Sequence, residues 1–284
     1  MQSAARPLTD TKSPFGTYAG HGVGRFVWAL ADRRSLAKPV RRRLRRVAES
    51  RFAGPYDTTV DGLKFRLYPG ENYDDRKMLA KGRLPERAEH RALAPYLKPG
   101  VTFVDVGANI GSYALFAAAK GADVVAVEAN PATQERLDYN IAVNGADCGA
   151  VRVVPRAVSD REGSLTLWTT PTNSGFATGA RELTTGEPAG EWRAIEVEVC
   201  PLCKLLVEAG VKRVDVLKVD VEGLEDRVLL PFLAATPAGD LPDVVMFETN
   251  CSAVWQGDCR AALEKAGYEP VCETNDNLIV ARRA

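Results

Sequence analysis

The chain has 284 residues, of which 45% are hydrophobic and 26% charged, and its formal net charge is zero. This composition is ordinary for a soluble globular protein with a sizeable core and room for one large or two small domains. No apolar run reaches the roughly 18–20 residues of a membrane-spanning helix. The first 22 residues contain no continuous apolar core, so we expect no secretory signal and a cytoplasmic location.

The net charge of zero conceals an uneven distribution. Residues 1–60 hold 12 Lys and Arg against 4 Asp and Glu, a net of +8, which leaves −8 for residues 61–284. A surface that binds a nucleic-acid duplex must be positively charged to contact the phosphates, whereas residues 61–284 carry a net negative charge. We therefore expect no nucleic-acid partner.

Most of the basic excess lies in the segment Arg33–Arg51. Within it, Val40, Leu44 and Val47 recur at helical spacing among arginines, which predicts an amphipathic basic helix. Such a helix could contact an anionic membrane surface or an anionic substrate. The alternative is a helix that packs on the acidic body of its own domain or of a second subunit in a homodimer. We favour packing, because membrane-active helices usually carry more bulky apolar residues.

We divide the chain into a basic extension, residues 1–57, that is partly disordered and partly helical, and a domain of residues 58–284. The first 20 residues are rich in Ser, Thr, Pro and Gly and are expected to be poorly ordered. Thr58–Gly70 alternates apolar and polar residues around an Asp-Gly turn, which predicts a small hairpin. Pro85–Leu97 has the pattern of a helix.

A regular alternation of strands and helices follows. We expect strands at residues 102–106, 123–128, 151–158, 214–219 and 243–248, and helices at residues 112–120, 131–144, 201–209, 224–235 and 258–266. Two last strands, residues 268–273 and 277–283, are joined by a short turn and should pair antiparallel. The alternation predicts a mostly parallel, doubly wound α/β sheet, in which ligands bind at the carboxyl ends of the strands where the strand order reverses.

A β-like excursion interrupts this alternation before the helix at residues 201–209. It consists of SLTLW and AIEVEV, and the residues between these two strands are polar and Gly-rich. Long Gly-rich loops at the ligand edge of a sheet are often functional. Thr169–Gly190 is therefore a candidate lid over the substrate.

The chain has six cysteines and two histidines. Only Cys200 and Cys203 are closely spaced, and a zinc site would need a second pair of ligands. Both histidines, His21 and His90, lie far upstream. We expect ordinary thiols rather than a zinc site or a redox pair, and no catalysis driven by histidine.

The segment FVDVGANIG and the strand VVAVEANP that follows have the features of a nucleotide-binding unit. Gly107 and Gly111 let the backbone approach a ligand closely, and the next helix offers free N–H groups to an anion. Glu128 ends the second strand and can accept both hydroxyls of a ribose. These features fit NAD or S-adenosylmethionine (SAM). The dinucleotide fingerprint is broken at Asn109, and Asp105 would repel a pyrophosphate but suits the positive charges of SAM.

Five segments together resemble the FkbM family of class I SAM-dependent methyltransferases: FVDVGANIGSYAL, VVAVEANPATQERLDYNIAVNG, AVSDREGSLTL, TNSGFAT and VDVLKVDVEGLEDRVL. The upstream segment YPGENYDDRKML is similar to one in some members. The resemblance covers roughly residues 65–283 in the family's motif order. It implies a seven-stranded Rossmann-like sheet with the last strand antiparallel, and O-methylation of hydroxyls in sugars, polyketides or other secondary metabolites. Members often have Leu-Asp before the helix at residues 201–209, where this chain has CPLC.

The expected SAM site consists of the glycine-rich turn and the strand ends beside it. Glu128 is expected to hold the ribose, and Asp105 the amino group, directly or through water. Adenine should lie near the ends of the third strand, and one aromatic residue is expected to close the pocket by resemblance alone. The full predicted set is Asp105, Gly107, Asn109, Gly111, Glu128, Ala129, Ala157, Val158 and Tyr73.

The cluster LKVDVEG emerges where the fourth strand ends, beside the expected methyl group. Methyl transfer is an in-line displacement, so the enzyme must align the acceptor oxygen and remove its proton. The predicted catalytic residues are Lys218, Asp220, Glu222 and, closing the next strand, Glu248. The three acids could also hold a divalent cation, and we leave the metal undecided. Equally, Lys218 and one acid could form an ion pair that shapes the pocket.

We predict a SAM-dependent O-methyltransferase that acts on a small-molecule or carbohydrate-like acceptor. One alternative is an NAD-dependent oxidoreductase, which the missing middle glycine and the lack of a Tyr-x-x-x-Lys or catalytic His disfavour. Another is a non-catalytic Rossmann-like binding domain. Such a domain would need neither the glycines nor Glu128.

Overall fold

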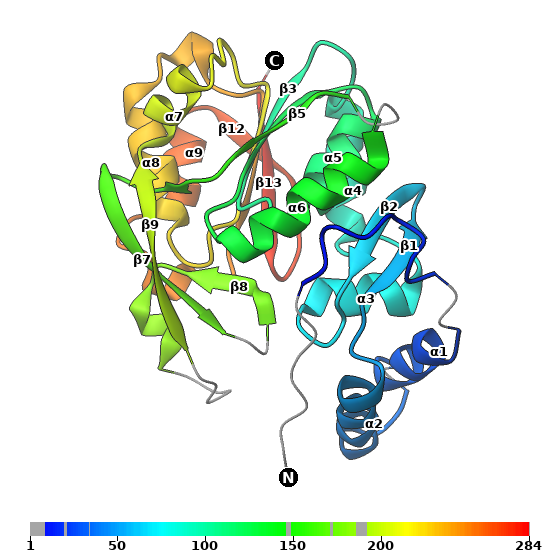
Figure 1. Ribbon diagram of the computed structural model, residues 1–284. Coiled ribbons are helices and arrows are strands. Elements are labelled where there is room, and N and C mark those ends of the chain that lie inside the picture. Colours follow the sequence, from blue (N-terminus) through cyan, green and yellow to red (C-terminus); the bar gives the residue numbers. More distant parts are fainter. Residues whose placement is uncertain are drawn as a thin grey trace.

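The computed structural model describes residues 9–19, 22–33, 35–145, 149–170, 173–185 and 192–283. A seven-stranded sheet runs through its centre (Figure 1). In spatial order the strands are β12 (Tyr268–Glu273), β13 (Asn277–Arg282), β11 (Val244–Glu248), β10 (Val216–Val219), β3 (Thr102–Val106), β4 (Asp123–Val127) and β5 (Val151–Val154). β13 is antiparallel to both of its neighbours and the other pairs are parallel. The predicted seven-stranded, doubly wound α/β fold is confirmed.

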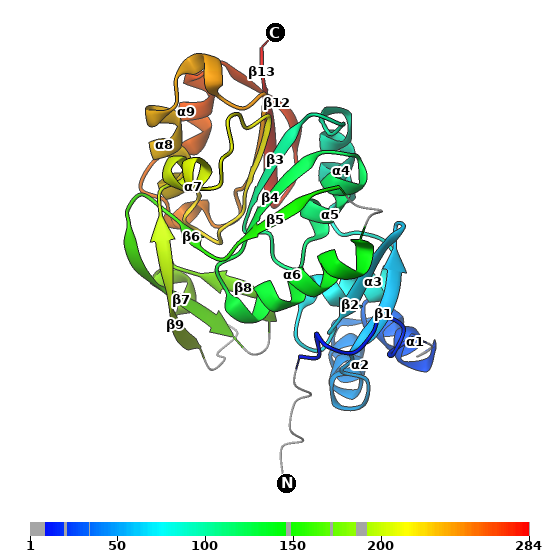
Figure 2. The same ribbon diagram turned by 45° about the horizontal axis from the view of Figure 1, so that its top comes forward.

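Alternate residues of the buried strands point to opposite faces of the sheet and form two apolar layers. Phe103 and Met246 belong to one layer, Val104 and Phe247 to the other. Helices cover the first face with α4 (Arg87–Leu93), α5 (Ser112–Ala119) and α6 (Pro131–Asn144), and the second with α7 (Leu202–Glu208), α8 (Glu225–Ala235) and α9 (Cys259–Lys265) (Figure 2). Both faces of the sheet are therefore buried, so a ligand can reach the sheet only at its edge.

Side chains at the helix starts explain two of the helix boundaries. Asn130 caps α6 by accepting a hydrogen bond from Ala132 N, and Pro131 supplies the fixed φ that suits the first helical position. Asp258 caps α9 by accepting from Ala261 N. Short 3-10 helices complete the layers at η1 (Ala94–Tyr96), η4 (Ala238–Asp240) and η5 (Ser252–Val254).

The basic segment forms α2 (Lys38–Arg51), as the spacing predicts. α2 packs on α1 (Gly22–Ala31), and α1 also contacts α3 (Tyr73–Lys81). The expected apolar stripe is wrong in detail, because Val40 and Val47 are exposed while Ala48 is fully buried. The helix faces its own domain through a small residue, with Leu44 half-buried beside it.

The predicted hairpin is formed by β1 (Tyr56–Val60) and β2 (Leu63–Leu67). The boundary that we drew after residue 57 falls inside β1. Trp28 and Ala48, from the N-terminal extension, share an apolar cluster with Phe103 of the central sheet. The division into an extension and a domain stays a prediction.

The expectation of poor order in the first 20 residues is wrong for residues 9–19. Arg66 of β2 is buried and donates hydrogen bonds to the carbonyl oxygens of Asp10, Ser13 and Pro14 at 2.9–3.0 Å. Its guanidinium also pairs with Asp57 at 2.7 Å. A buried charge needs such partners, so the N-terminal segment completes the site of Arg66.

A second, four-stranded sheet carries the β-like excursion. Its strands lie in the order β6 (Ala157–Val158), β9 (Arg193–Cys200), β7 (Gly163–Thr170) and β8 (Asn173–Thr178). The single strand predicted at residues 151–158 is wrong: it is split between β5 and β6 at Pro155, which has no N–H to donate to a strand ladder. The candidate lid Thr169–Gly190 contains β8 and the 3-10 helix η3 (Arg181–Thr184), while residues 171–172 and 186–190 of it lie outside the described residues.

Across the described residues, no helix has the length and apolar character that crossing a membrane requires.

Candidate active site

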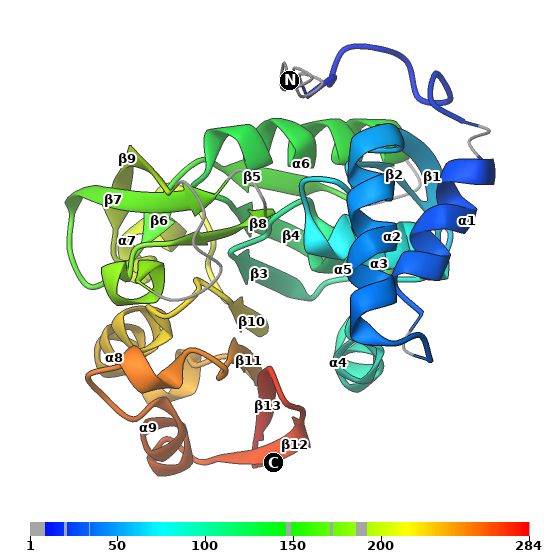
Figure 3. The same ribbon diagram turned by 90° about the horizontal axis from the view of Figure 1, so that it is seen from below.

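One cavity of about 500 Å³ opens at the carboxyl ends of β3, β4, β10 and β11. This is the edge where the strand order reverses, because the chain moves from β3 outward to β5 and then returns to β10 on the other side of β3. Strand β8 lies across the same edge (Figure 3). The predicted site residues that line the cavity are Tyr73, Gly107, Asn109, Glu128, Ala129, Ala157, Val158, Asp220, Glu222 and Glu248.

The turn after β3 requires glycine for a steric reason. Gly107 has φ +81°, and a Cβ atom there would lie 1.8 Å from the backbone oxygen of Asp220. Gly111 has φ +96°, and a Cβ there would lie 2.8 Å from a side-chain carbon of Leu137. The loops after β3 and β10 can approach each other only because residue 107 has no side chain.

Glu128 lies at the end of β4 and is only 8% exposed. Its two carboxylate oxygens accept hydrogen bonds from the backbone N–H groups of Asn109 and Asn130, each at 2.8 Å. Burial raises the pKa of Glu128 to about 7. Each oxygen keeps a further lone pair, so the carboxylate can still accept a pair of hydroxyl donors from the cavity.

Lys218 and Asp105 do not line the cavity but lie behind it. Lys218 Nζ is 3.1 Å from Asp105 Oδ1 and 3.2 Å from Asp220 Oδ2, and it donates a hydrogen bond to Gly107 O at 3.2 Å. The ion pair that we left open is therefore formed, with two acids rather than one. Gly111 is the third predicted residue that lies outside the lining.

A buried acid that the sequence reasoning missed organises the loop after β10. Glu225 is fully buried and accepts hydrogen bonds from the backbone N–H groups of Val221 and Gly223 and from Trp255 Nε1, at 2.8–3.2 Å. Within the loop that these bonds hold, Glu222 adopts φ +54°, a left-handed conformation that is rare for a residue other than glycine. The only sign of Glu225 in the sequence is its position in the first turn of the predicted helix that became α8.

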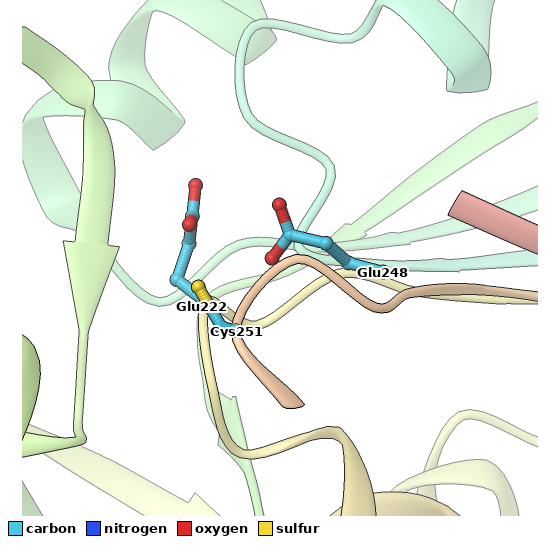
Figure 4. Close-up of side chains that lie close together, drawn as sticks. All are labelled: Glu222, Glu248 and Cys251. Carbon is cyan, nitrogen blue, oxygen red and sulfur yellow. The ribbon is translucent and has the colours of Figure 1, made fainter. Parts of the chain in front are cut away.

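Glu222 and Glu248 meet at the far end of the cavity, where their carboxylates and the thiol of Cys251 lie within 4.8 Å of one another. Figure 4 shows both carboxylates extending to the same side, with the sulfur of Cys251 beside Glu222. Burial and the negative charge of Asp220 raise the pKa of Glu222 well above its usual range and that of Glu248 to about 11. Sequence reasoning missed Cys251, because it treated all cysteines as ordinary thiols.

Glu86 is a second missed residue in the lining. It precedes α4 with φ +51° and accepts a hydrogen bond from the buried Tyr113 hydroxyl at 2.8 Å. Burial raises its pKa to about 7, with Asp74 and Asp220 adding to the effect. No sequence motif surrounds Glu86, so its position in the cavity could not be predicted from the sequence.

Comparison with known proteins identifies the family. The sequence profile of the methyltransferase FkbM domain matches residues 105–270, which is more than half of the chain. The chain belongs to the FkbM methyltransferase family. Membership of this family favours a methyltransferase over the oxidoreductase and the non-catalytic alternatives.

Two relatives place this FkbM chain among named enzymes. It is 32% identical over 151 residues to methyltransferase sdnD of Sordaria araneosa, a match that covers 44% of this chain and 58% of the relative. It is 29% identical over 221 residues to the 31-O-demethyl-FK506 methyltransferase FkbM of Streptomyces tacrolimicus, covering 66% of this chain and 82% of the relative. The chain thus spans less than two thirds of the length of sdnD.

Solved structures show distant similarity to this FkbM protein. The magnesium protoporphyrin IX methyltransferase ChlM of Synechocystis, with bound SAM, is 11% identical, with a TM-score of 0.41 over 74% of this chain and 83% of that one. The 16S rRNA N2 G1207 methyltransferase RsmC of T. thermophilus is 16% identical, with a TM-score of 0.42 over 80% of this chain and 50% of that one.

Proposed function

We propose that the protein transfers the methyl group of SAM to a hydroxyl oxygen of a small molecule, a carbohydrate-like or secondary-metabolite acceptor. One observation carries the proposal: a single cavity joins Glu128, after β4, to Glu222, in the loop after β10, and to Glu248, the last residue of β11. A nucleoside site and a site for removing a proton therefore share one space.

The charge of the lining favours SAM over NAD. Two basic side chains, Lys77 and Arg156, face seven carboxyl side chains. The carboxyl side chains of the lining are Asp74, Glu86, Glu128, Asp220, Glu222, Glu248 and Asp276. The raised pKa values of Glu222 and Glu248 favour their neutral forms, but the five other acids still outnumber the two basic side chains. Such a cavity attracts the sulfonium and ammonium charges of SAM and repels a pyrophosphate.

The cofactor end of the cavity fits an adenosine. Glu128 offers carboxylate lone pairs to the two ribose hydroxyls, and the turn at Gly107 leaves room for a ligand next to the backbone. Ala157 and Val158 begin the small sheet and supply apolar contact for the adenine, as do Leu165 and Leu167 of β7.

The other end of the cavity would hold the acceptor. Bound SAM supplies the methyl carbon, to which the acceptor oxygen bonds as the carbon–sulfur bond breaks and the sulfur keeps the electron pair. The chain aligns the acceptor oxygen and takes its proton, and Asp220 is a carboxylate within the cavity that can accept it. The raised pKa of Glu222 favours its neutral form, which can hydrogen-bond to the acceptor. Phe176 of β8 also lines the cavity and offers an aromatic surface for the carbon framework of the acceptor.

Two features support a secondary-metabolite or sugar acceptor. The relative from Streptomyces tacrolimicus is named a 31-O-demethyl-FK506 methyltransferase, and an O-demethyl position is a hydroxyl. A cavity of about 500 Å³ that must also hold SAM admits a small molecule or the end of a larger one. The charge of the body around it gives no support to a nucleic-acid acceptor. Cytoplasmic location, a homodimer and contact of α2 with a membrane surface stay predictions.

Calorimetry with S-adenosylhomocysteine, with NAD as the control ligand, tests the cofactor. We expect micromolar binding of S-adenosylhomocysteine and no heat from NAD. Product analysis by mass spectrometry with SAM and a panel of sugar and polyketide hydroxyls then tests the acceptor class, and we expect a mass gain of one methylene. Binding of NAD alone would contradict the proposed function.

A further inference from the structure

The far end of the cavity brings together three potential metal ligands from separate parts of the chain. Glu222 lies in the loop after β10, Glu248 ends β11, and Cys251 lies in the turn that follows β11. Their donor atoms lie within 4.8 Å of one another. Small side-chain rotations would bring two oxygens and one sulfur to the distances of about 2.0–2.3 Å at which such atoms bind a divalent ion.

Glu248 gives an independent indication of a missing ligand. Only 8% of the residue is exposed, and its Oε2 is buried without a hydrogen-bond partner. Buried polar atoms are almost always paired, and a carboxylate oxygen without a donor is costly to bury. Glu248 itself belongs to the cluster with Glu222 and Cys251, so a cation between the three residues would give its buried carboxyl group a partner.

Asp220, which the sequence suggested as a third metal ligand, is already engaged. Its Oδ2 lies 3.2 Å from the buried ammonium of Lys218. The structure therefore replaces Asp220 by Cys251 in the candidate set. That exchange changes the metal, because magnesium and calcium prefer oxygen ligands, whereas a thiolate selects zinc and similar ions.

We propose that Glu222, Glu248 and Cys251 form a binding site for a divalent cation of the class to which zinc belongs. Three protein ligands leave a fourth position open, as in catalytic zinc sites. Glu222 and Glu248 line the cavity, so a cation bound to them would be within reach of an acceptor there.

The role of the cation rests on the proposed function. An acceptor hydroxyl that takes the open position would lose its proton more readily, because a bound divalent ion lowers the pKa of an oxygen ligand. The proton would pass to Asp220, which lines the same cavity, and the oxygen would then bond to the methyl carbon as the carbon–sulfur bond breaks.

Cobalt is the probe, because it replaces zinc and reports thiolate ligation by a near-ultraviolet charge-transfer band. The full chain is stripped with a chelator and titrated with Co²⁺ in the absence of SAM. We expect the wild type to bind one equivalent of Co²⁺ and to show this band.

The band should disappear in Cys251→Ser, and Glu248→Gln should bind Co²⁺ at least tenfold more weakly. Cys203→Ser, which removes another half-buried thiol on α7, is the matched control and should keep the band.

A second measurement needs no variant and so does not depend on whether Cys251→Ser folds. Zn²⁺ should slow the alkylation of Cys251 by iodoacetamide in the wild type and leave that of Cys203 unchanged, as read by mass spectrometry of peptides. Absence of Co²⁺ binding, an unchanged band in Cys251→Ser, or equal alkylation with and without Zn²⁺ would overturn the inference. Binding of S-adenosylhomocysteine, measured in chelator, reports on the proposed function separately.

Discussion

Lys218 Nζ lies 3.1 Å from Asp105 Oδ1, and the two side chains have exposed fractions of only 2% and 0%. The pair joins β10 to β3 at the point where the strand order reverses. The same ammonium donates to the carbonyl oxygen of Gly107, the residue at which the chain turns into the cavity. Lys218, predicted as a catalytic residue, and Asp105, predicted to hold the amino group of SAM, thus bind each other behind the cavity.

Replacing Lys218 by Met should destabilise the fold by about 3–5 kcal/mol, because it leaves Asp105 buried without its partner. Urea denaturation measures the free energy of unfolding. The control Lys204→Met removes an exposed ion pair with Glu162 and should change the free energy of unfolding little. Equal stability of the two variants would show that the buried pair is not needed for the fold.

Gly107→Ala should lower stability by more than about 2 kcal/mol and abolish binding of S-adenosylhomocysteine, since a Cβ atom there meets the backbone of Asp220. Gly210→Ala is the matched control. Its φ is also positive, at +67°, but nothing lies within 4 Å of the added atom, so only backbone strain of about 1 kcal/mol is expected. Thermal melts and calorimetry distinguish the two.

Binding of S-adenosylhomocysteine should depend on pH through Glu128. Its pKa is raised to about 7, so the carboxylate that we propose as the acceptor for the ribose hydroxyls forms as the pH rises through neutrality. We expect affinity to be about tenfold weaker at pH 6 than at pH 8. In Glu128→Gln, affinity should be weak and the same at both pH values. A wild-type affinity that does not change with pH would contradict the assigned role.

Asp220→Asn and Glu222→Gln should each bind S-adenosylhomocysteine like the wild type and lose about 10²–10⁴-fold in turnover, because they act on the acceptor and not on the nucleoside. Calorimetry and single-turnover assays measure the two effects. Glu269→Gln, which removes only a surface ion pair with Arg283, serves as the control with full turnover. Loss of cofactor affinity in Asp220→Asn would place that acid at the other end of the cavity.

Arg66→Met should release the N-terminal segment. Without the guanidinium, the carbonyl oxygens of Asp10, Ser13 and Pro14 each lose one donor and Asp57 loses its partner, so we expect residues 9–19 to become accessible to proteases. Limited proteolysis followed by mass spectrometry locates the cuts. Tyr139→Phe removes only one hydrogen bond, to Ser13 O, so this variant should be cleaved more slowly than Arg66→Met. Cleavage at the wild-type rate in Arg66→Met would show that other contacts hold the segment.

The sequence alone was enough for the sheet, because each strand and helix is encoded locally. The apolar run Val244–Phe247 is buried on both faces, and caps such as Asn130 mark where helices begin. The order of the strands follows from the alternation of elements and from the handedness of their connections. The turn at Gly107 and the acid Glu128 could be recognised for the same reason, since both stand next to strands that the pattern defines.

Tertiary structure alone decided which polar groups meet. Glu222 and Cys251 are separated by the whole of α8 and β11, and Glu86 precedes the first strand of the central sheet, yet all three lie at one edge. The sequence suggested a cofactor role for Asp105 and a catalytic role for Lys218, but both side chains lie outside the lining of the cavity and bind each other. Spacing along a strand gives the face on which a side chain lies. Whether that side chain reaches a ligand or another buried charge depends on neighbours from distant segments, which no local pattern records.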